Sequence, residues 1–224
     1  NFNMMIMVIY ALITIAIFGM WYYARYEGNF LPSPKKTFNP MMLVAIVILV
    51  PGTQFAANFI ANLTGYIRPD WLQQYNELFE TSGITDTTFV TVLYSVILAP
   101  ICEELIFRGV TMRCARKALP FALANLMQAA LFGLFHLNWI QGIYAFALGI
   151  VLGYVCERGG SIYYSIGLHL LFNLWGTLSG FFPDPGNSVV VFVIVIAVTI
   201  VSLVVGFVLF NKGRRKLPIN STGI

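Results

Sequence analysis

Two glutamates and an arginine stand in the segment APICEELIFRGV, within a run of otherwise apolar residues. An acidic side chain at the centre of a membrane helix costs about 2.5–3.5 kcal/mol on insertion scales, so two in succession need an explanation. Glu104 and Arg108 are spaced i, i+4, which predicts an ion pair on one helical face. Glu103 points about 100° away from that pair. We therefore expect Glu103 to be the residue that performs chemistry.

The two histidines of the chain also fall in apolar segments that are predicted to be helical. His136 ends the segment FGLFH, and Asn125 lies three turns before it. His169 and Asn173 are spaced i, i+4 in HLLFN, so both project from one helical face. Histidine and asparagine inside a membrane are functional-site candidates by default, although they also form hydrogen bonds between helices.

A helical hairpin brings Glu103 to the level of His136. Pro120 is a favoured first-turn residue, so we expect the second helix of the hairpin to start near it. With the turn at residue 119, Glu103 lies sixteen residues before the turn and His136 seventeen after it. The rise per residue is the same in both helices, so the two side chains reach about the same depth. A similar count places His169 near the middle of the membrane.

A glutamate, two histidines and an asparagine in a shielded pocket fit hydrolysis by an activated water. Glu103 can act as general base, while His136 holds the same water and shuttles its proton. His169 and Asn173 can donate side by side to the oxyanion that forms on an amide carbonyl. This scheme needs no metal and no cofactor.

Two other catalytic interpretations stay open. Glutamate and two histidines can bind zinc, although the chain lacks the H-E-x-x-H spacing and asparagine is an unusual zinc ligand. Cys102 adjoins the acidic pair and could supply a thiol nucleophile, but cysteine is also a common small apolar filler.

The elements that must carry these residues are predicted to be membrane helices. The chain has 224 residues, 58% hydrophobic and only 10% charged, with a mean hydropathy of +0.80. A soluble domain carries roughly 25% charged residues. We expect an all-α, polytopic helix bundle that forms one domain over residues 1–224, with a catalytic core at about 88–182. Runs of the length of a spanning helix lie at 3–23, 41–63, 88–107, 119–138, 139–157, 161–182 and 188–210.

A short amphipathic helix is also predicted, over residues 71–79 on the outer interface. The first apolar run has no basic n-region and no small-residue cleavage site, so we do not interpret it as a cleavable signal peptide. Because the chain begins at Asn1 rather than Met, an eighth helix upstream stays open.

The basic residues predict an orientation. If the loops alternate between the two sides, Arg68 falls on one side and eleven basic residues fall on the other: Arg25, Lys35, Lys36, Arg113, Arg116, Lys117, Arg158, Lys212, Arg214, Arg215 and Lys216. The positive-inside rule then puts the C-terminus in the cytoplasm and residue 1 outside. Without a soluble basic domain, the net charge of +4 gives no support for a nucleic-acid partner. The three cysteines fall in helices or on the inner side, which argues against a disulfide framework.

The ordered set EELIFR, FGLFH and HLLFN, on successive hydrophobic helices, resembles the CPBP family. This is the CAAX-protease and bacteriocin-processing (Abi) family of intramembrane glutamic endopeptidases. The resemblance implies that Glu103 and His136 activate water, that His169 and Asn173 form the oxyanion hole, and that Glu104 and Arg108 support them. It covers Glu103 to Asn173, about a third of the chain. The family often has eight helices, which again raises the question of an upstream helix.

The resemblance implies a peptidase of the cell membrane whose substrate is a membrane-associated peptide or protein. Eukaryotic members trim prenylated CaaX proteins, whereas bacterial members are linked to bacteriocin maturation, self-immunity and peptide-signal processing. The short chain is more similar to a bacterial member. The alternative is a non-catalytic membrane partner, such as an immunity or assembly factor, that uses the same polar residues between helices. A proton-coupled transporter lacks support, because we find no matching pair of Gly/Pro-broken helices. The sequence does not determine the substrate, its cleavage site or the oligomeric state.

Overall fold

The computed structural model describes residues 2–27, 38–82, 88–179 and 188–214, and every element in these ranges is a helix. The predicted all-α fold is therefore confirmed. The α-helices are α1 (Phe2–Tyr22), α3 (Pro40–Ile67), α4 (Pro69–Ser82), α5 (Phe89–Val92), α6 (Ala99–Glu104), α7 (Arg113–Ala115), α8 (Phe121–Phe135), α9 (Trp139–Gly159), α10 (Ile162–Ser179) and α11 (Val189–Arg214). Three π-helical segments continue them: η1 (Tyr23–Glu27), η2 (Leu93–Leu98) and η3 (Leu105–Met112).

Five helices of the described residues are long and apolar enough to cross a membrane. They are Met4–Arg25, Pro40–Ile67, Phe89–Ala115, Trp139–Gly159 and Val189–Arg214. The other two predicted spans are also apolar helices but fall short of this criterion. α8 has 15 residues, or about 22 Å at the rise of an α-helix, against roughly 30 Å of hydrocarbon. α10 has 18 residues and includes the polar His169 and Asn173.

Parts of the sequence-based predictions lie outside the described residues. The predicted sixth span extends to residue 182, whereas the described part of α10 ends at Ser179. The predicted charge asymmetry also depends on residues that are not described: Lys35, Lys36, Asp86, Asp184, Arg215 and Lys216. The orientation of the chain in the membrane therefore stays a prediction. The predicted amphipathic segment at 71–79 lies within α4.

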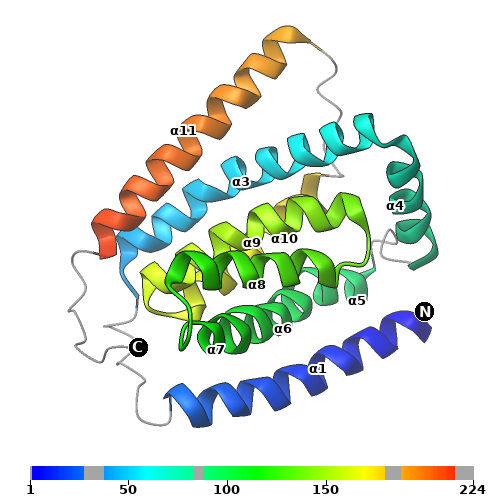
Figure 1. Ribbon diagram of the computed structural model, residues 1–224. Helices are drawn as coiled ribbons and strands as arrows, with labels where there is room; N and C mark the ends of the chain where they lie inside the picture. Colours follow the sequence, from blue (N-terminus) through cyan, green and yellow to red (C-terminus); the bar gives the residue numbers. More distant parts are fainter. Residues whose placement is uncertain (1, 28–37, 83–87, 180–187, 215–224) are drawn as a thin grey trace.

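The helices that carry the candidate residues form the middle of the bundle (Figure 1). α5 to α7, α8, α9 and α10 lie between α1 on one side and α3 on the other, and α11 lies outside α3. The buried core beneath α3 draws apolar side chains from several of these helices, among them Leu49, Phe132, Leu152, Leu168 and Phe210. α1 and α3 thus flank the central group on two sides.

One asparagine fixes the start of α3 against two other helices. Asn39 is the N-cap, and its side-chain oxygen accepts a hydrogen bond from the Met41 amide at 2.9 Å. Its side-chain nitrogen donates to the Gly213 carbonyl at 3.0 Å, and its backbone amide donates to the Tyr164 hydroxyl at 2.9 Å. The start of α3 is therefore bonded to the end of α11, so the two helices run antiparallel.

Small residues let α3 and α11 pack closely along their length. Pro51 stands inside α3, and Ser202 of α11 inserts its hydroxyl into the helix next to it. The Ser202 hydroxyl donates to the Ile48 carbonyl and accepts from the Gly52 amide at 2.8 Å, which are the two groups of one i, i+4 backbone pair. Insertion of a side chain into the backbone ladder is a recognised cause of a helix bend.

We predict that Gly206→Val destabilises the bundle by about 1–3 kcal/mol, the usual cost of overpacking a filled core. A Cβ at Gly206 meets the Leu49 side chain at 2.6 Å, too close to be accommodated without a shift. Thermal unfolding in detergent measures the change. Val204→Leu, at a position 57% exposed on the same helix, is the control and should leave the midpoint unchanged. Equal midpoints for the two variants would contradict this account of the α3–α11 contact.

Candidate active site

The first two candidate residues lie on one long helix that changes its winding beside them. Phe89 to Ala115 form one continuous helix in which two π-helical segments, η2 and η3, interrupt the α-helical hydrogen bonding. Glu103 and Glu104 end α6, immediately before η3. π-Bulges inside α-helices occur frequently at functional sites, because the extra residue redirects the side chains around it.

Glu104 is the centre of a buried polar cluster. Its Oε1 atom accepts from Arg108 Nη1 at 2.7 Å and from His169 Nδ1 at 2.9 Å. The Glu104 and Arg108 side chains are both 0% exposed. The predicted i, i+4 ion pair is therefore present, and it is completed by a histidine from a helix that lies 65 residues further along the chain. Arg108 also lies over the Phe132 ring, 4.5 Å from its centroid.

His169 lies between the two glutamates. Its Nδ1 atom contacts Glu104, and its Nε2 atom lies 3.6 Å from Glu103 Oε2. The first distance is a hydrogen bond, whereas the second is longer than the usual range. Because a carboxylate only accepts, Nδ1 carries a proton and the imidazole ring is held in a fixed orientation. Nε2 therefore faces Glu103 across a short gap.

His136 is held by the turn between α8 and α9. Its Nδ1 atom lies 2.9 Å from the Phe132 carbonyl, and because a carbonyl only accepts, the proton is on Nδ1. The Nε2 lone pair is then free to accept a proton. The Phe132 ring contacts both imidazoles, with its centroid 5.0 Å from that of His136 and 5.7 Å from that of His169, so the two histidines adjoin one aromatic side chain.

The turn that follows His136 has an unusual backbone. The sequence predicted that His136 lies inside a helix. In the structure it is instead the C-cap of α8, just after the last helical residue. Leu137 has a φ of 57°, the left-handed region in which a non-glycine residue costs about 1–2 kcal/mol. Asn138 stabilises this turn, since its side chain donates to the His136 carbonyl at 3.1 Å and accepts from the Gln141 amide at 2.7 Å.

Asn173 lies one helical turn beyond His169 on α10, as its spacing predicted. Its side-chain nitrogen donates to the Ser95 carbonyl in η2 at 2.8 Å. An amide nitrogen carries two hydrogens, so this contact leaves one donor for another acceptor. The π-helical segment thus anchors Asn173 to the helix that carries Glu103.

Sequence reasoning missed the polar side chain that joins α8 to this cluster. Gln128 is fully buried, and its side-chain nitrogen donates to the Gly149 carbonyl at 2.9 Å and to Asn125 Oδ1 at 2.7 Å. The same carbonyl accepts from Arg108 Nη2 at 3.2 Å. Asn125 donates to the Ile150 carbonyl at 3.0 Å and belongs to this interhelical network rather than to the pocket around Glu103. The sequence did offer a signal for Gln128, because it is a polar residue in an apolar helix and lies three positions after Asn125.

Two observations concern the alternative chemistries. Within the described residues, no group of three or more His, Cys, Asp and Glu side chains is arranged to hold a metal ion. Cys102 is 3% exposed, and its thiol lies against Thr14 of α1 rather than against the histidines. The donor set near Glu103 therefore consists of carboxylate, imidazole and amide groups.

Exposure distinguishes the two glutamates. The Glu103 side chain is 15% exposed, whereas those of Glu104 and His169 are 0% and 4% exposed. Glu103 is therefore the one of these three side chains that a small molecule can contact from outside the cluster. A carboxylate that meets water at the edge of a buried polar cluster can remove a proton from that water, with hydrogen-bond donors already in place beside it.

One comparison with known proteins found a family match over part of the chain. Residues 85–175 match the family described as Type II CAAX prenyl endopeptidase Rce1-like. This match confirms the resemblance to the CPBP family over the segment that holds all six candidate residues. The apolar helices, five of which are long enough to cross a membrane, indicate a multi-pass membrane protein, and the matched segment is similar to a CAAX-type peptidase family. Comparisons with curated proteins and with solved structures gave no match.

We predict that Arg108→Gln destabilises the bundle by about 3–5 kcal/mol, because it leaves Glu104 buried without its cation. Arg116→Gln is the matched control: Arg116 pairs with Glu157 at 3.1 Å, is 22% exposed, and should cost about 1 kcal/mol or less. Thermal unfolding in detergent compares them. The double variant Glu104→Gln/Arg108→Gln should recover part of the loss, since no buried charge is left unpaired. An Arg108→Gln midpoint no lower than that of Arg116→Gln would contradict this account.

Proposed function

We propose that the chain is an intramembrane endopeptidase that uses Glu103 and His136 to activate water. Its substrate is a peptide bond in a membrane-associated peptide or protein. The match of residues 85–175 to the family described as Type II CAAX prenyl endopeptidase Rce1-like supports this function. The observation that carries the proposal is the placement of His169 between two glutamates, of which only Glu103 has exposed surface.

In the first step, a water beside Glu103 attacks the carbonyl carbon of the substrate amide. One proton of the water passes to the Glu103 carboxylate or to the free Nε2 of His136, and the remaining hydroxyl forms the new C–O bond. The carbonyl electrons move onto oxygen and produce a tetrahedral oxyanion. Collapse of this intermediate breaks the C–N bond, and the stored proton goes to the leaving amine. No enzyme residue becomes acylated.

His169 and Asn173 supply the donors for the oxyanion. On this proposal His169 carries a hydrogen on each ring nitrogen when the oxyanion forms, because Nδ1 donates to Glu104 and Nε2 must donate to the oxyanion. Its Nε2 hydrogen faces Glu103 in the resting state. When Glu103 takes a proton and loses its charge, that hydrogen becomes free for the oxyanion that forms in the same step.

A non-catalytic membrane partner, such as a bacteriocin self-immunity or assembly factor, is the second candidate. The observation that favours it is that His169 and Asn173 already bond to Glu104 and to the Ser95 carbonyl across helices. Intramembrane polar residues often serve only as contacts of this kind. On this alternative the chain stabilises an assembly and cuts nothing.

We predict that Glu103→Gln lowers peptide cleavage at least 10²-fold while the protein stays folded, since an amide cannot take the proton from water. The measurement is mass spectrometry of a library of short membrane peptides, with and without a farnesyl group, incubated with the purified protein in detergent. Cys102→Ser should keep its activity, and a strong chelator should not change the rate.

Two outcomes would contradict the proposal. Full activity in Glu103→Gln would exclude this carboxylate as the base. In cells, an unchanged phenotype in Glu103→Ala and His169→Ala strains that accumulate the protein would favour the non-catalytic partner.

We predict that Asn173→Ala lowers kcat by about 10²- to 10³-fold with little change in KM, as loss of one oxyanion donor usually does. Leu174→Ala, at the next and more exposed position of α10, is the control and should keep the parent kcat. Steady-state kinetics on a peptide found in the library screen separates the two constants. A rise in KM at unchanged kcat would place Asn173 in substrate binding and remove it from the oxyanion hole.

A further inference from the structure

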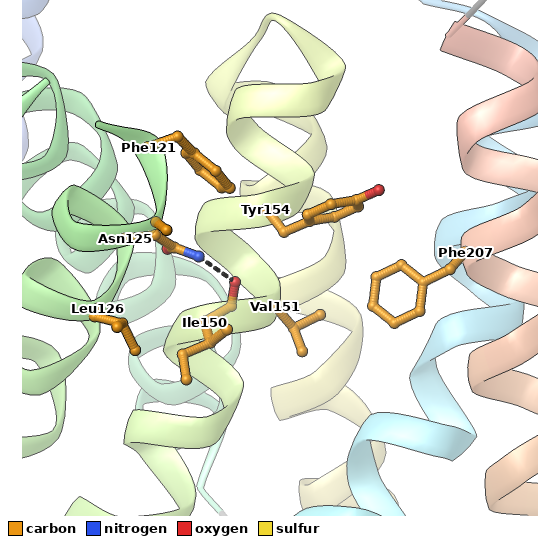
Figure 2. Close-up of a pocket in the computed structure, with 8 residues that line it drawn as sticks. Phe121, Asn125, Leu126, Ile150, Val151, Tyr154 and Phe207 are labelled. Carbon is orange, nitrogen blue, oxygen red and sulfur yellow. Dashed lines mark hydrogen bonds between the residues drawn. The ribbon is translucent and has the colours of Figure 1, made fainter.

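An apolar groove of about 530 Å³ lies on the bundle away from Glu103, between α8, α9 and α11. Figure 2 shows Phe121, Asn125 and Leu126 of α8 on one side, and Phe207 of α11 on the other. The floor between them comes from α9, through Ile150, Val151 and Tyr154. The only polar side chain groups on this lining are the Asn125 amide, which is bonded to the Ile150 carbonyl, and the Tyr154 hydroxyl, which donates to Asn211 at 2.8 Å. The groove therefore offers a bound molecule almost purely hydrocarbon contact.

Two of the helices around the groove end in a basic residue, and a third basic residue precedes the start of α8. Lys117 lies four residues before Phe121, Arg158 lies four residues after Tyr154, and Lys212 follows Asn211. All three side chains are exposed. The Arg158 guanidinium is 5.7 Å from the centroid of the Tyr154 ring, so it lies directly at the mouth of the groove.

These cations lack carboxylate partners on the helices of the groove. Glu157 is the one acidic residue of α8, α9 and α11, and it pairs with Arg116 at 3.1 Å. Within the part of the chain that the structure describes, neither Arg158 nor Lys212 forms an ion pair with a carboxylate, so both can bind an external anion. The groove has the volume of a small-molecule site, roughly 300–1,000 Å³, and carries positive charge at one end.

We propose that this groove binds one anionic glycerophospholipid, with an acyl chain against Val151 and Phe207 and the phosphate at Arg158 and Lys212. A groove that faces hydrocarbon fills with lipid chain, because an empty groove forfeits the dispersion contacts of its lining. The charges add selectivity, since basic pockets between membrane helices bind the headgroups of anionic lipids. The proposal goes beyond peptidase activity and does not depend on it.

The test is native mass spectrometry of the purified full chain, titrated separately with dioleoyl phosphatidylglycerol and dioleoyl phosphatidylcholine. We expect one phosphatidylglycerol to be retained in preference to phosphatidylcholine. Arg158→Gln and Lys212→Gln should each weaken phosphatidylglycerol retention about five-fold, with little effect on phosphatidylcholine. Arg68→Gln, which removes an exposed cation at the far end of α3, is the control for charge and should change neither.

A second pair of variants tests the acyl-chain part of the groove. Leu126→Trp fills the lining at a position that is already 46% exposed, so the helix should fold normally. It should lower the retention of phosphatidylglycerol, whereas Leu123→Trp, 52% exposed on the same helix but outside the lining, should not. Equal retention of the two lipids by the parent chain, or equal retention by the two tryptophan variants, would overturn the proposal. So would displacement of the lipid by a farnesylated peptide at one-to-one stoichiometry, which would assign the groove to substrate.

Discussion

The contact on which the site depends is the pair of hydrogen bonds to Glu104. A carboxylate with no exposed surface is strongly destabilising unless its charge is matched and its oxygens are bonded. Arg108 provides the charge from the same helix, and His169 provides a second donor from α10. Arg108 in turn reaches the Gly149 carbonyl of α9. One buried carboxylate therefore joins the helices that must converge for the site to exist.

The two glutamates, although adjacent, differ in exposure and in the groups that surround them. Glu104 faces a dry cluster and determines where the imidazole of His169 points. Glu103 lies at the more exposed edge of the same ring, close to Nε2 but beyond hydrogen-bond distance. A short gap between a carboxylate and a fixed imidazole is a place where a small polar molecule can be held by both. The cluster thus has a buried part, formed by Glu104 and His169, and one exposed carboxylate, that of Glu103.

Much of this fold follows from hydropathy, and the first motif follows from helical spacing. The seven apolar runs became seven helices or helix groups, and the i, i+4 rule placed Glu104 beside Arg108. Three features were beyond these rules. The π-helical segments depend on hydrogen bonds that local periodicity does not encode. The left-handed turn at Leu137 contains no glycine, the residue from which such a turn is usually predicted. The contact of His169 with both glutamates depends on tertiary packing. The roles of the candidate residues stay a proposal, since position alone does not establish catalysis.

The separation of the two partners of Glu104 along the chain has a consequence for biogenesis. Arg108 is available as soon as the helix that carries Glu104 has been synthesised, because the two residues are one turn apart. His169 is synthesised 65 residues later. During membrane insertion, the nascent helix must therefore enter the bilayer with its ion pair as the sole internal compensation for the buried acid. The order of synthesis explains why the arginine belongs on the same helix and the histidine can arrive from another.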